Sequence, residues 1–283
     1  MPQARRPALL VVATVLVLGV GAAHAQTTLE RIRDENRVRI AIADEAPYGF
    51  RNAEGEVTGE APSIAREVLT RIDPEIEIEW VSTAFGDLIP GLQEGRFDIA
   101  AAGMFITPER CAEVAFSDPT YVVGEAFTVA AGNPKGLTDY ETISADPDAR
   151  VGLIVGTVEP NYALVTGIPA DRAPLYRTFD QAIEALKAGE IDAIGMTALT
   201  AQVIADEHPD LAATGQFFPS VDGEVTKGYG AFAFRREDTA LRDAFNEVLD
   251  VFISSDAHWA LVERFGFGPE MAPDASAEQL CAG

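Results

Sequence analysis

The sequence predicts an α/β protein of two lobes, each lobe a mainly parallel sheet flanked by helices. Three observations predict this fold class. Short apolar strands alternate with helical stretches along most of the chain, residues 132–228 carry a strand–helix–strand pattern of their own, and two apolar strands bracket that middle segment. A chain of 283 residues is also long enough to bury two separate hydrophobic cores.

The first part of the chain supplies the elements of the first lobe. Short apolar runs, expected to be strands, cover residues 38–43, 76–81 and 98–102. Segments with helical spacing cover residues 63–71, 85–94, 241–254 and 257–265. Because strands and helices alternate, we expect most strand pairs in this lobe to be parallel.

The middle segment supplies the second lobe. Residues 151–153 and 193–194 are expected to be strands, with a helix at residues 179–188 between them. Residues 126–131 and 230–234 are expected to be the two hinge strands that cross between the lobes. The first lobe then comprises residues 28–131 and 229–283, and the second comprises residues 132–228. A small ligand belongs in the cleft between them, because open α/β sheets bind at the carboxyl ends of their strands.

The first 25 residues have the pattern of a secretory signal peptide. Arg5 and Arg6 precede an apolar run at residues 8–20, and Ala23-His24-Ala25 provides a cleavage site. The run is short for a membrane span, and no cysteine directly follows Ala25 to carry a lipid. We therefore expect an exported, soluble periplasmic protein.

Cys111 and Cys281 remain after cleavage, in what should be an oxidising compartment. An even number of cysteines in an exported chain favours a disulfide, so we expect a Cys111–Cys281 bridge. The alternative is two separate buried thiols.

Charge and residue content exclude several kinds of partner and chemistry. The formal net charge is −24, and removal of Arg5 and Arg6 makes it more negative, which disfavours nucleic acid and anionic membranes. The remaining histidines, His208 and His258, fall in expected surface segments and show no metal-ligand spacing with the cysteines. No acid and base are paired near a histidine, so we expect neither an enzyme nor a cofactor.

The segment RFDIAAAGMFITPERCAEVAFSDP, residues 96–119, leads a buried strand directly into one arginine. Thr107 and Pro108 are expected to open a helix and to place Arg110 in its first turn. A cation there opposes the helix macrodipole, so we interpret the planar guanidinium as a binding group for an anion, a carboxylate above all. The alternative is a structural ion pair with a neighbouring acid such as Glu109, Glu113 or Asp118.

The sequences G-R-F-D-I, I-T-P-E-R and F-S-D-P resemble the polar amino-acid type (family 3) of periplasmic solute-binding proteins of ABC importers. The resemblance extends from about residue 28 to residue 267. It implies the two-lobe type II periplasmic binding protein fold, with Arg110 gripping the carboxylate of the ligand. It also implies a monomeric receptor that closes around its ligand and delivers it to a membrane permease.

A second group of candidate ligand contacts lies at strand exits. Glu45 and Tyr48 belong to D-E-A-P-Y-G-F after the first strand, where Pro47 favours a turn. Phe85 and Phe105 end neighbouring segments, and with Tyr48 they could form three walls of an aromatic box. Such a box prefers a cation whose charge is delocalised and weakly hydrated. The alternative is that all three are ordinary core aromatics.

One expected acid is absent. In amino-acid-binding members of the family, an aspartate after the late strand of the second lobe pairs with the α-ammonium of the ligand. Here the segment reads G-M-T-A-L-T, with Thr197 at that place, and Asp192 resembles a structural acid that comes earlier. We therefore expect a primary ammonium to be left underpaired on this wall of the cleft.

The sequences E-A-P-Y-G-F, T-G-E-A-P and G-M-T-A-L-T resemble the ectoine/hydroxyectoine-binding proteins of compatible-solute importers. That resemblance implies a cyclic zwitterion whose carboxylate is held by Arg110 and Thr157 and whose amidinium is held by Glu45. The expected ligand-binding residues are Glu45, Tyr48, Phe85, Phe105, Arg110, Thr157 and Thr197. Two alternatives stay open: a receptor for another amino acid or a betaine-like zwitterion, and an enzyme like the periplasmic cyclohexadienyl dehydratases, which share this architecture.

Overall fold

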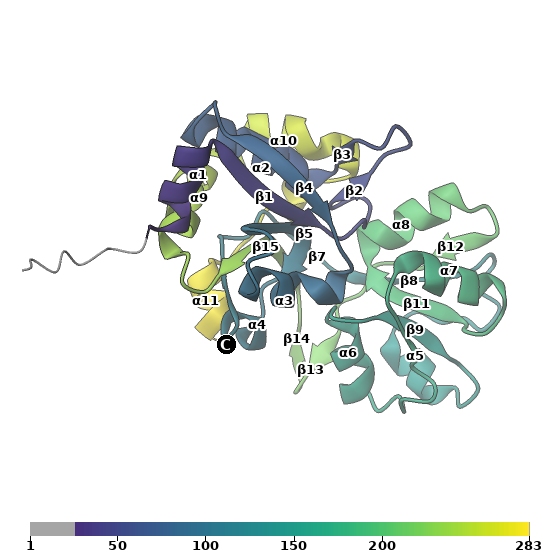
Figure 1. The fold of residues 1–283 in the computed structure, drawn as a ribbon. Helices are drawn as coiled ribbons and strands as arrows, with labels where there is room; N and C mark the ends of the chain where they lie inside the picture. Colours follow the sequence, from purple (N-terminus) through teal and green to yellow (C-terminus); the bar gives the residue numbers. More distant parts are fainter. Residues whose placement is uncertain (1–25, 283) are drawn as a thin grey trace, which may run out of the picture.

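The apolar runs of the sequence form the centres of two separate sheets in the computed structural model, which describes residues 26–282 (Figure 1). The expected signal peptide, residues 1–25, lies outside the described residues. Each strand and helix that the sequence predicted is present, with its ends within three residues or so of the expected ones. No helix in residues 26–282 is long and apolar enough to cross a membrane.

The first sheet has the strand order β4-β1-β5-β15-β6, and β7 also pairs with β15. Its strands are β1 (Arg37–Ile42), β4 (Glu77–Ser82), β5 (Ile99–Phe105), β6 (Val114–Phe116), β7 (Tyr121–Val123) and β15 (Gly228–Arg235). Strand β1 pairs in parallel with β4 and β5, whereas β15 runs antiparallel to β5, β6 and β7. The sheet is therefore mixed, with a parallel centre and an antiparallel long strand.

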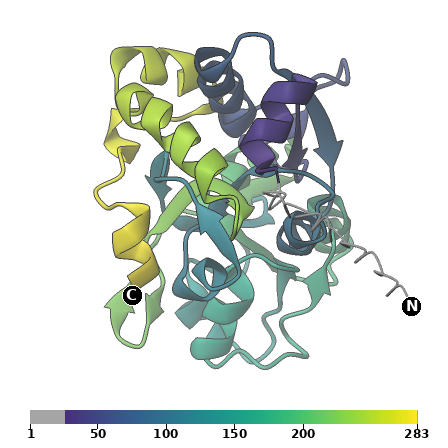
Figure 2. The same cartoon turned by 60° about the vertical axis from the view of Figure 1, so that its left-hand side comes forward.

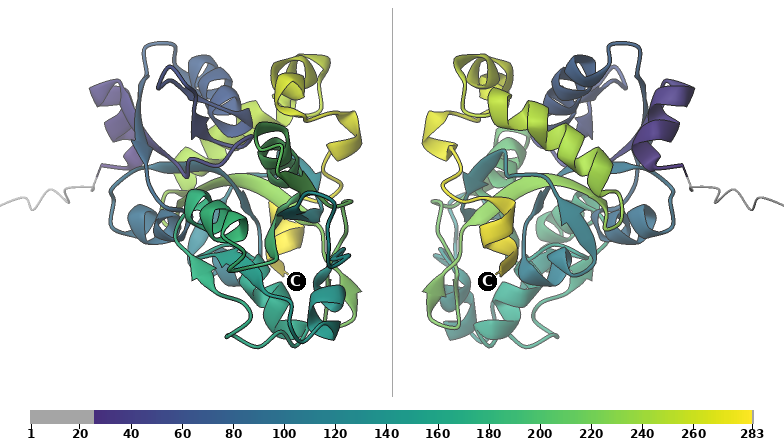
Figure 3. Two further views of the ribbon diagram at one scale, coloured as in Figure 1. Left: turned by 90° about the vertical axis from the view of Figure 1, so that its right-hand side faces the viewer. Right: turned by 90° about the vertical axis from the view of Figure 1, so that its left-hand side faces the viewer.

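Helices cover both faces of the first sheet because its central strands are apolar on both sides. Along β5, Ile99 and Ala101 belong to the core under α2, while Ala100 and Ala102 belong to the core on the opposite side. The helices of this lobe are α1 (Thr28–Glu35), α2 (Glu60–Ile72), α3 (Leu88–Gln93), α4 (Pro108–Cys111), α9 (Thr239–Phe252), α10 (Asp256–Val262) and α11 (Ala277–Ala282). The right-hand view of Figure 3 shows α9 lying across this lobe.

The second sheet has the strand order β10-β9-β11-β8-β12. Its strands are β8 (Glu125–Ala130), β9 (Val151–Ile154), β10 (Leu175–Tyr176), β11 (Ala193–Thr197) and β12 (Leu211–Ala213). The helices around it, which face the viewer in the left-hand view of Figure 3, are α5 (Tyr140–Ala145), α6 (Glu159–Val165), α7 (Phe179–Lys187) and α8 (Ala198–Glu207). Strand β9 is parallel to β10 and β11, and β8 is antiparallel to β11 and β12.

Shorter elements complete the chain. Two hairpins pair β2 (Phe50–Arg51) with β3 (Val57–Thr58) and β13 (Ser220–Val221) with β14 (Glu224–Val225). Short 3-10 helices are η1 (Phe85–Asp87), η2 (Glu263–Phe265) and η3 (Pro269–Met271).

The expected α/β two-lobe fold is confirmed, with helices on both sheets. The expectation of mainly parallel sheets is wrong: the first sheet has two parallel and three antiparallel strand pairs among the described residues, and the second has two of each, because β15 and β8 run antiparallel to their neighbours. For the lobe boundaries we propose one change to the expected division. Strand β8, residues 125–130, was expected in the first lobe, but it pairs only with strands of the second sheet. Strand β7, two residues earlier, pairs with β15 of the first sheet. We therefore place the first crossing at Gly124 and keep the return crossing at the start of β15.

The histidines differ from expectation at one position. His258 was expected in a surface segment, but it is buried in α10, where its Nδ1 accepts a hydrogen bond from the backbone N–H of Ser254 at 3.2 Å. Burial lowers the pKa of His258 to about 4. His258 is therefore a neutral packing residue of the first lobe.

The expected disulfide is present. Cys111 and Cys281 are bonded, with their Cα atoms 5.7 Å apart, and the bond joins α4 to α11 across 170 residues of sequence. Figures 1 and 2 show α11 at the end of the chain beside α4. Because α4 carries Arg110, the bridge also anchors the helix that presents this arginine.

We expect no free thiol in the oxidised, denatured protein. A Cys111→Ser/Cys281→Ser double variant should lose roughly 3–5 kcal/mol of unfolding free energy, because the bridge closes a long loop in the unfolded chain. Urea unfolding of both proteins measures the difference. Two titratable thiols in the untreated protein, or equal stabilities, would contradict this.

Candidate functional site

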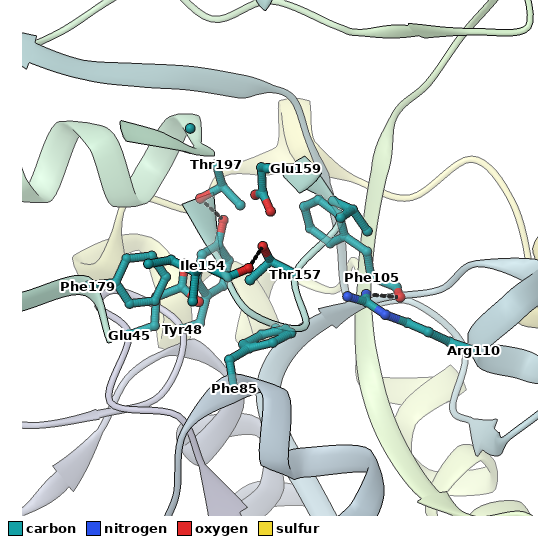
Figure 4. A pocket seen from close by; sticks show the side chains of 13 residues that line it. Glu45, Tyr48, Phe85, Phe105, Arg110, Ile154, Thr157, Glu159, Phe179 and Thr197 are labelled. Atoms are coloured by element: carbon teal, nitrogen blue, oxygen red, sulfur yellow. Dashed lines mark hydrogen bonds between the residues drawn. The ribbon is translucent and has the colours of Figure 1, made fainter. Parts of the chain in front are cut away.

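One pocket between the lobes collects all seven residues that the sequence singled out (Figure 4). Its cavity volume is about 20 Å³, so the lobes fit closely together around it in this arrangement. The expected residues that line it are Glu45, Tyr48, Phe85, Phe105, Arg110, Thr157 and Thr197. The other lining residues are Gly103, Ile154, Val158, Glu159, Phe179 and Gly195. Residues up to Arg110 come from the first lobe and the others from the second.

The turn after β1 places Glu45 and Tyr48 at the pocket. The backbone N–H groups of Tyr48 and Gly49 both donate to the carbonyl of Glu45, at 2.9 Å each, as expected for a tight turn near Pro47. The first N–H groups of α2, at Glu60 and Ala61, donate to the carbonyls of Pro47 and Tyr48 at 3.0 Å. Helix α2 thus satisfies its own N-terminal donors by holding this turn.

Arg110 lies in the first turn of α4, as expected, with Thr107 capping the helix. Arg110 as a whole is 8% exposed; its Nη1 donates to the carbonyl of Phe105 at 2.7 Å and its Nη2 to the carbonyl of Gly156 at 2.8 Å. Among the described residues no carboxylate forms an ion pair with it within 4.0 Å. The alternative of a salt bridge to a nearby acid on the same segment is therefore wrong, and a buried cation faces the pocket with no carboxylate of the described residues in direct contact with it.

Two glycines allow the lobes to meet beside Arg110. Gly156 has a φ of +88°, and a Cβ atom there would lie 2.5 Å from the Cα of Gly86 in the opposite lobe. This close approach brings the carbonyl of Gly156 within reach of Arg110. Side chains at either position would hold the lobes apart.

A chain of hydrogen bonds joins the two lobes at the other end of the pocket. The hydroxyl of Tyr48 donates to Oγ1 of Thr197 at 2.9 Å, and Thr197 donates to Oγ1 of Thr200 at 3.1 Å. Thr200 in turn donates to Oε1 of Glu45 at 2.7 Å. Thr197 is also the N-cap of α8. In this closed arrangement the Thr197 hydroxyl is occupied by protein groups.

Aromatic rings form much of the wall. Phe85 and Phe105 are buried, and the guanidinium carbon of Arg110 lies 5.7 Å from the centroid of the Phe85 ring. Tyr48 stacks on Tyr121 with ring centroids 5.2 Å apart, so it is both a core residue and a pocket wall. Phe179, the first residue of α7, is a further ring in the wall that the sequence did not indicate as a site residue.

Burial dominates the electrostatics of the acidic side of the pocket. Desolvation raises the pKa of Glu45 to about 8, the nearby carboxyl of Glu159 adds to this, and the hydrogen bond from Thr200 opposes it. Glu45 thus holds a proton at neutral pH as long as no cation lies against it. Burial also lowers the pKa of Arg110, and the Glu159 carboxyl partly offsets that effect.

Glu159 corrects one expectation from the sequence. The wall of the second lobe was expected to lack an acid because Thr197 replaces the aspartate of amino-acid-binding relatives. Glu159, the first residue of α6, lies on that wall and is 4% exposed. Its place after Gly156-Thr157, at the end of β9, is the signal that would have indicated it.

Thr157 lines the pocket as expected, but its hydroxyl donates to the carbonyl of Ile154 at 2.8 Å. In this structure it can therefore offer only its oxygen lone pairs, as an acceptor.

Comparisons with known proteins agree with this architecture. The chain belongs to the family of bacterial extracellular solute-binding proteins, family 3, whose model matches residues 38–269. A probable amino-acid ABC transporter periplasmic-binding protein, y4tE, of Sinorhizobium fredii is 36% identical over 278 residues, which cover 96% of this chain and 92% of the relative.

Solved structures resemble it as well. EhuB in complex with hydroxyectoine is 34% identical with a TM-score of 0.82, covering 92% of this chain and 100% of that chain. An ancestral amino acid-binding protein, a precursor of cyclohexadienyl dehydratase, is 25% identical with a TM-score of 0.71, covering 84% of this chain and 99% of that one. The family to which the chain belongs is thus one of binding proteins.

Glu60, in T-G-E-A-P, is a buried acid outside the pocket lining. It begins α2, is buried, and accepts a hydrogen bond from Oγ1 of Thr120 at 2.6 Å. Burial raises its pKa to about 8, so Glu60 interacts less strongly as an anion with the N-terminus of α2 near neutral pH.

A Glu60→Gln variant tests whether the pKa of Glu60 is raised in the folded protein. The raised pKa of folded Glu60 means that its stabilising contribution is complete below about pH 4.5 and is lost as the pH rises toward 8. The glutamine does not ionise, so the variant should gain stability relative to the parent protein by up to about 1.4 kcal/mol per pH unit over that range. Urea unfolding at pH 5, 6, 7 and 8 measures this, and a constant difference would refute it.

Proposed function

We propose that this protein is a periplasmic receptor that binds ectoine or hydroxyectoine and delivers it to the permease of an ABC importer by closing its cleft. Ectoine is a cyclic zwitterion with one carboxylate and a delocalised amidinium. One observation carries the proposal: a buried arginine and a buried carboxyl face the same ring-lined pocket, and among the described residues no carboxylate lies within 4.0 Å of the Arg110 guanidinium.

The carboxylate end of the ligand is assigned to Arg110. Its two described hydrogen bonds leave three of the five guanidinium N–H groups for a ligand. A buried guanidinium without an anion has lost its hydration without compensation, so a carboxylate that forms two parallel hydrogen bonds repays that cost.

The cationic end is assigned to Glu45 and the aromatic rings. The ring faces of Phe85, Phe105 and Tyr48 favour a cation with spread charge, which is cheaper to desolvate than a compact ammonium. Phe179 adds a further ring. EhuB, which resembles this chain along 92% of its length, is a protein solved with hydroxyectoine, and this supports the same ligand class here.

Closure follows from the contacts between the lobes. The Arg110–Gly156 bond and the chain from Tyr48 through Thr197 and Thr200 to Glu45 exist only when the lobes meet. A ligand that bridges Arg110 and Glu45 adds binding energy to this closed form and increases its population, and a permease can recognise it.

A second candidate function is the binding of an α-amino acid. Glu159 favours it, because it supplies the acid for an α-ammonium that Thr197 does not. A thermal-shift screen of ectoine, hydroxyectoine, proline, glycine betaine, histidine and arginine separates the candidates, since stabilisation grows with ligand concentration over Kd. We expect ectoine and hydroxyectoine to raise the melting temperature of the protein most. A larger rise with an amino acid would make amino-acid binding the better-supported function.

Arg110→Ala should lower the affinity for ectoine by roughly 30-fold or more, because removal of one partner of a buried charge pair costs about 2–5 kcal/mol. Isothermal calorimetry measures the affinity. Arg177→Ala is the matched control: it removes another arginine that joins the lobes, paired with Asp87 at 2.8 Å but exposed, and should change the affinity less than about 5-fold. Tight binding by folded Arg110→Ala protein would refute the assignment.

Affinity for the cationic ligand should rise with pH. In the empty pocket the pKa of Glu45 is about 8, so below that pH an amidinium must displace a proton from Glu45. The affinity should therefore increase between pH 6 and pH 8, with proton release detectable by calorimetry in two buffers of different ionisation enthalpy. Glu45→Gln should bind more weakly, and its affinity should depend less on pH. If the Glu45→Gln variant released as many protons on binding as the parent protein does, Glu45 would be excluded as the group that releases the proton.

A further inference from the structure

Two buried carboxyl groups, Glu159 and Glu125, belong to the second lobe, and the contacts assigned above to ectoine use neither of them. Glu159 lines the pocket and is 4% exposed, and Figure 4 shows its carboxyl pointing toward the space between Thr157 and Phe105. Glu125, the first residue of β8, is 2% exposed. The charge of Glu159 acts on the pKa of Glu125, so the two carboxyl groups lie within electrostatic reach of each other.

A hydrogen bond between two carboxyl groups requires a proton on one of them. With both groups ionised, Oε2 of Glu125 and Oε2 of Glu159 have no hydrogen-bond partner among the described residues, and neither has the hydroxyl of Tyr140 nearby. Desolvation raises the pKa of both acids, and for Glu125 the charge of Glu159 adds to the effect. One shared proton relieves the repulsion and leaves a single negative charge.

Four charged or titratable groups surround the two acids and feel the negative charge that the pair retains. They are Arg110 and Glu45 across the pocket and Tyr140 and Tyr162 behind it. Arg110 is the cation that favours ionised Glu159. When a carboxylate of the ligand occupies Arg110, this compensation falls, and Glu159 needs a donor from the ligand instead.

We propose that Glu125 and Glu159 form a second recognition element, in which Glu125 holds the shared proton and Glu159 accepts a hydrogen bond from an N–H or O–H group of the bound ligand. This inference rests on the proposed function and extends it. The pocket then selects zwitterions that present donors to both Glu45 and Glu159, and it rejects those without N–H or O–H donors on the cationic side, such as fully methylated betaines.

Paired glutamine variants test the two roles by calorimetry with ectoine and hydroxyectoine. Glu159→Gln should weaken binding at least 10-fold, because it removes the charged acceptor. Glu125→Gln should stay within about 3-fold, because its amide N–H supplies permanently the hydrogen bond that the shared proton supplies. Glu60→Gln, a buried acid outside the pocket lining, is the matched control and should also stay within 3-fold.

Two results would overturn the inference: Glu159→Gln that binds within 3-fold of the parent protein, or Glu125→Gln that loses as much affinity as Glu159→Gln. If the parent protein binds no compatible solute but binds an amino acid, the proposed function fails, and the same variants test the pair with that amino acid.

A measurement without ligand tests the shared proton directly. Groups with a raised folded-state pKa lose stabilisation as the pH rises, so the melting temperature of the parent protein should fall as the pH is raised above about 4.5. In Glu125→Gln this fall should be smaller. An equal fall in both proteins would show that no proton is shared.

Discussion

The site depends on a guanidinium that is removed from water without receiving a carboxylate from its own chain. Arg110 is 8% exposed and bonds only backbone carbonyls of Phe105 and Gly156 among its described hydrogen-bond partners. Such a group is costly in a structure that serves only its own stability, because burial favours the neutral form and arginine stays charged. The disulfide to α11, the Thr107 cap and the Gly86–Gly156 contact together fix this charge where an anion can reach it.

The acidic side of the pocket complements that charge in an unusual way. Glu45 lines the pocket opposite the arginine, and Glu159, backed by Glu125, lines the wall of the second lobe. Burial raises the pKa of all three, for Glu45 to about 8, so the empty pocket carries less negative charge near neutral pH than three exposed glutamates would. A ligand with a delocalised cation can exchange for a proton on one of these acids, whereas a neutral ligand cannot. Recognition and proton binding are thereby linked in one small volume.

Much of the site could be predicted from the sequence, because strand exits and turn residues are local signals. Apolar runs precede Glu45, Tyr48, Phe85 and Phe105. The pair Thr107-Pro108 predicts the start of the helix that carries Arg110. The contacts that could not be predicted form between segments far apart in the sequence. Glu125 lies near Glu159 because β8 pairs inside the second sheet. Thr200 contacts Glu45 only when the lobes close. The burial of His258 likewise follows from how α10 packs, which no local pattern indicated.

A crystal structure of the protein with ectoine tests the central claim most directly. The account predicts the ligand carboxylate in a two-bond contact with the guanidinium of Arg110, its ring between Phe85 and Phe105, and its amidinium against Glu45. A ligand bound in the reverse orientation, or one seated outside the cleft with Arg110 turned toward a protein carboxylate, would contradict it.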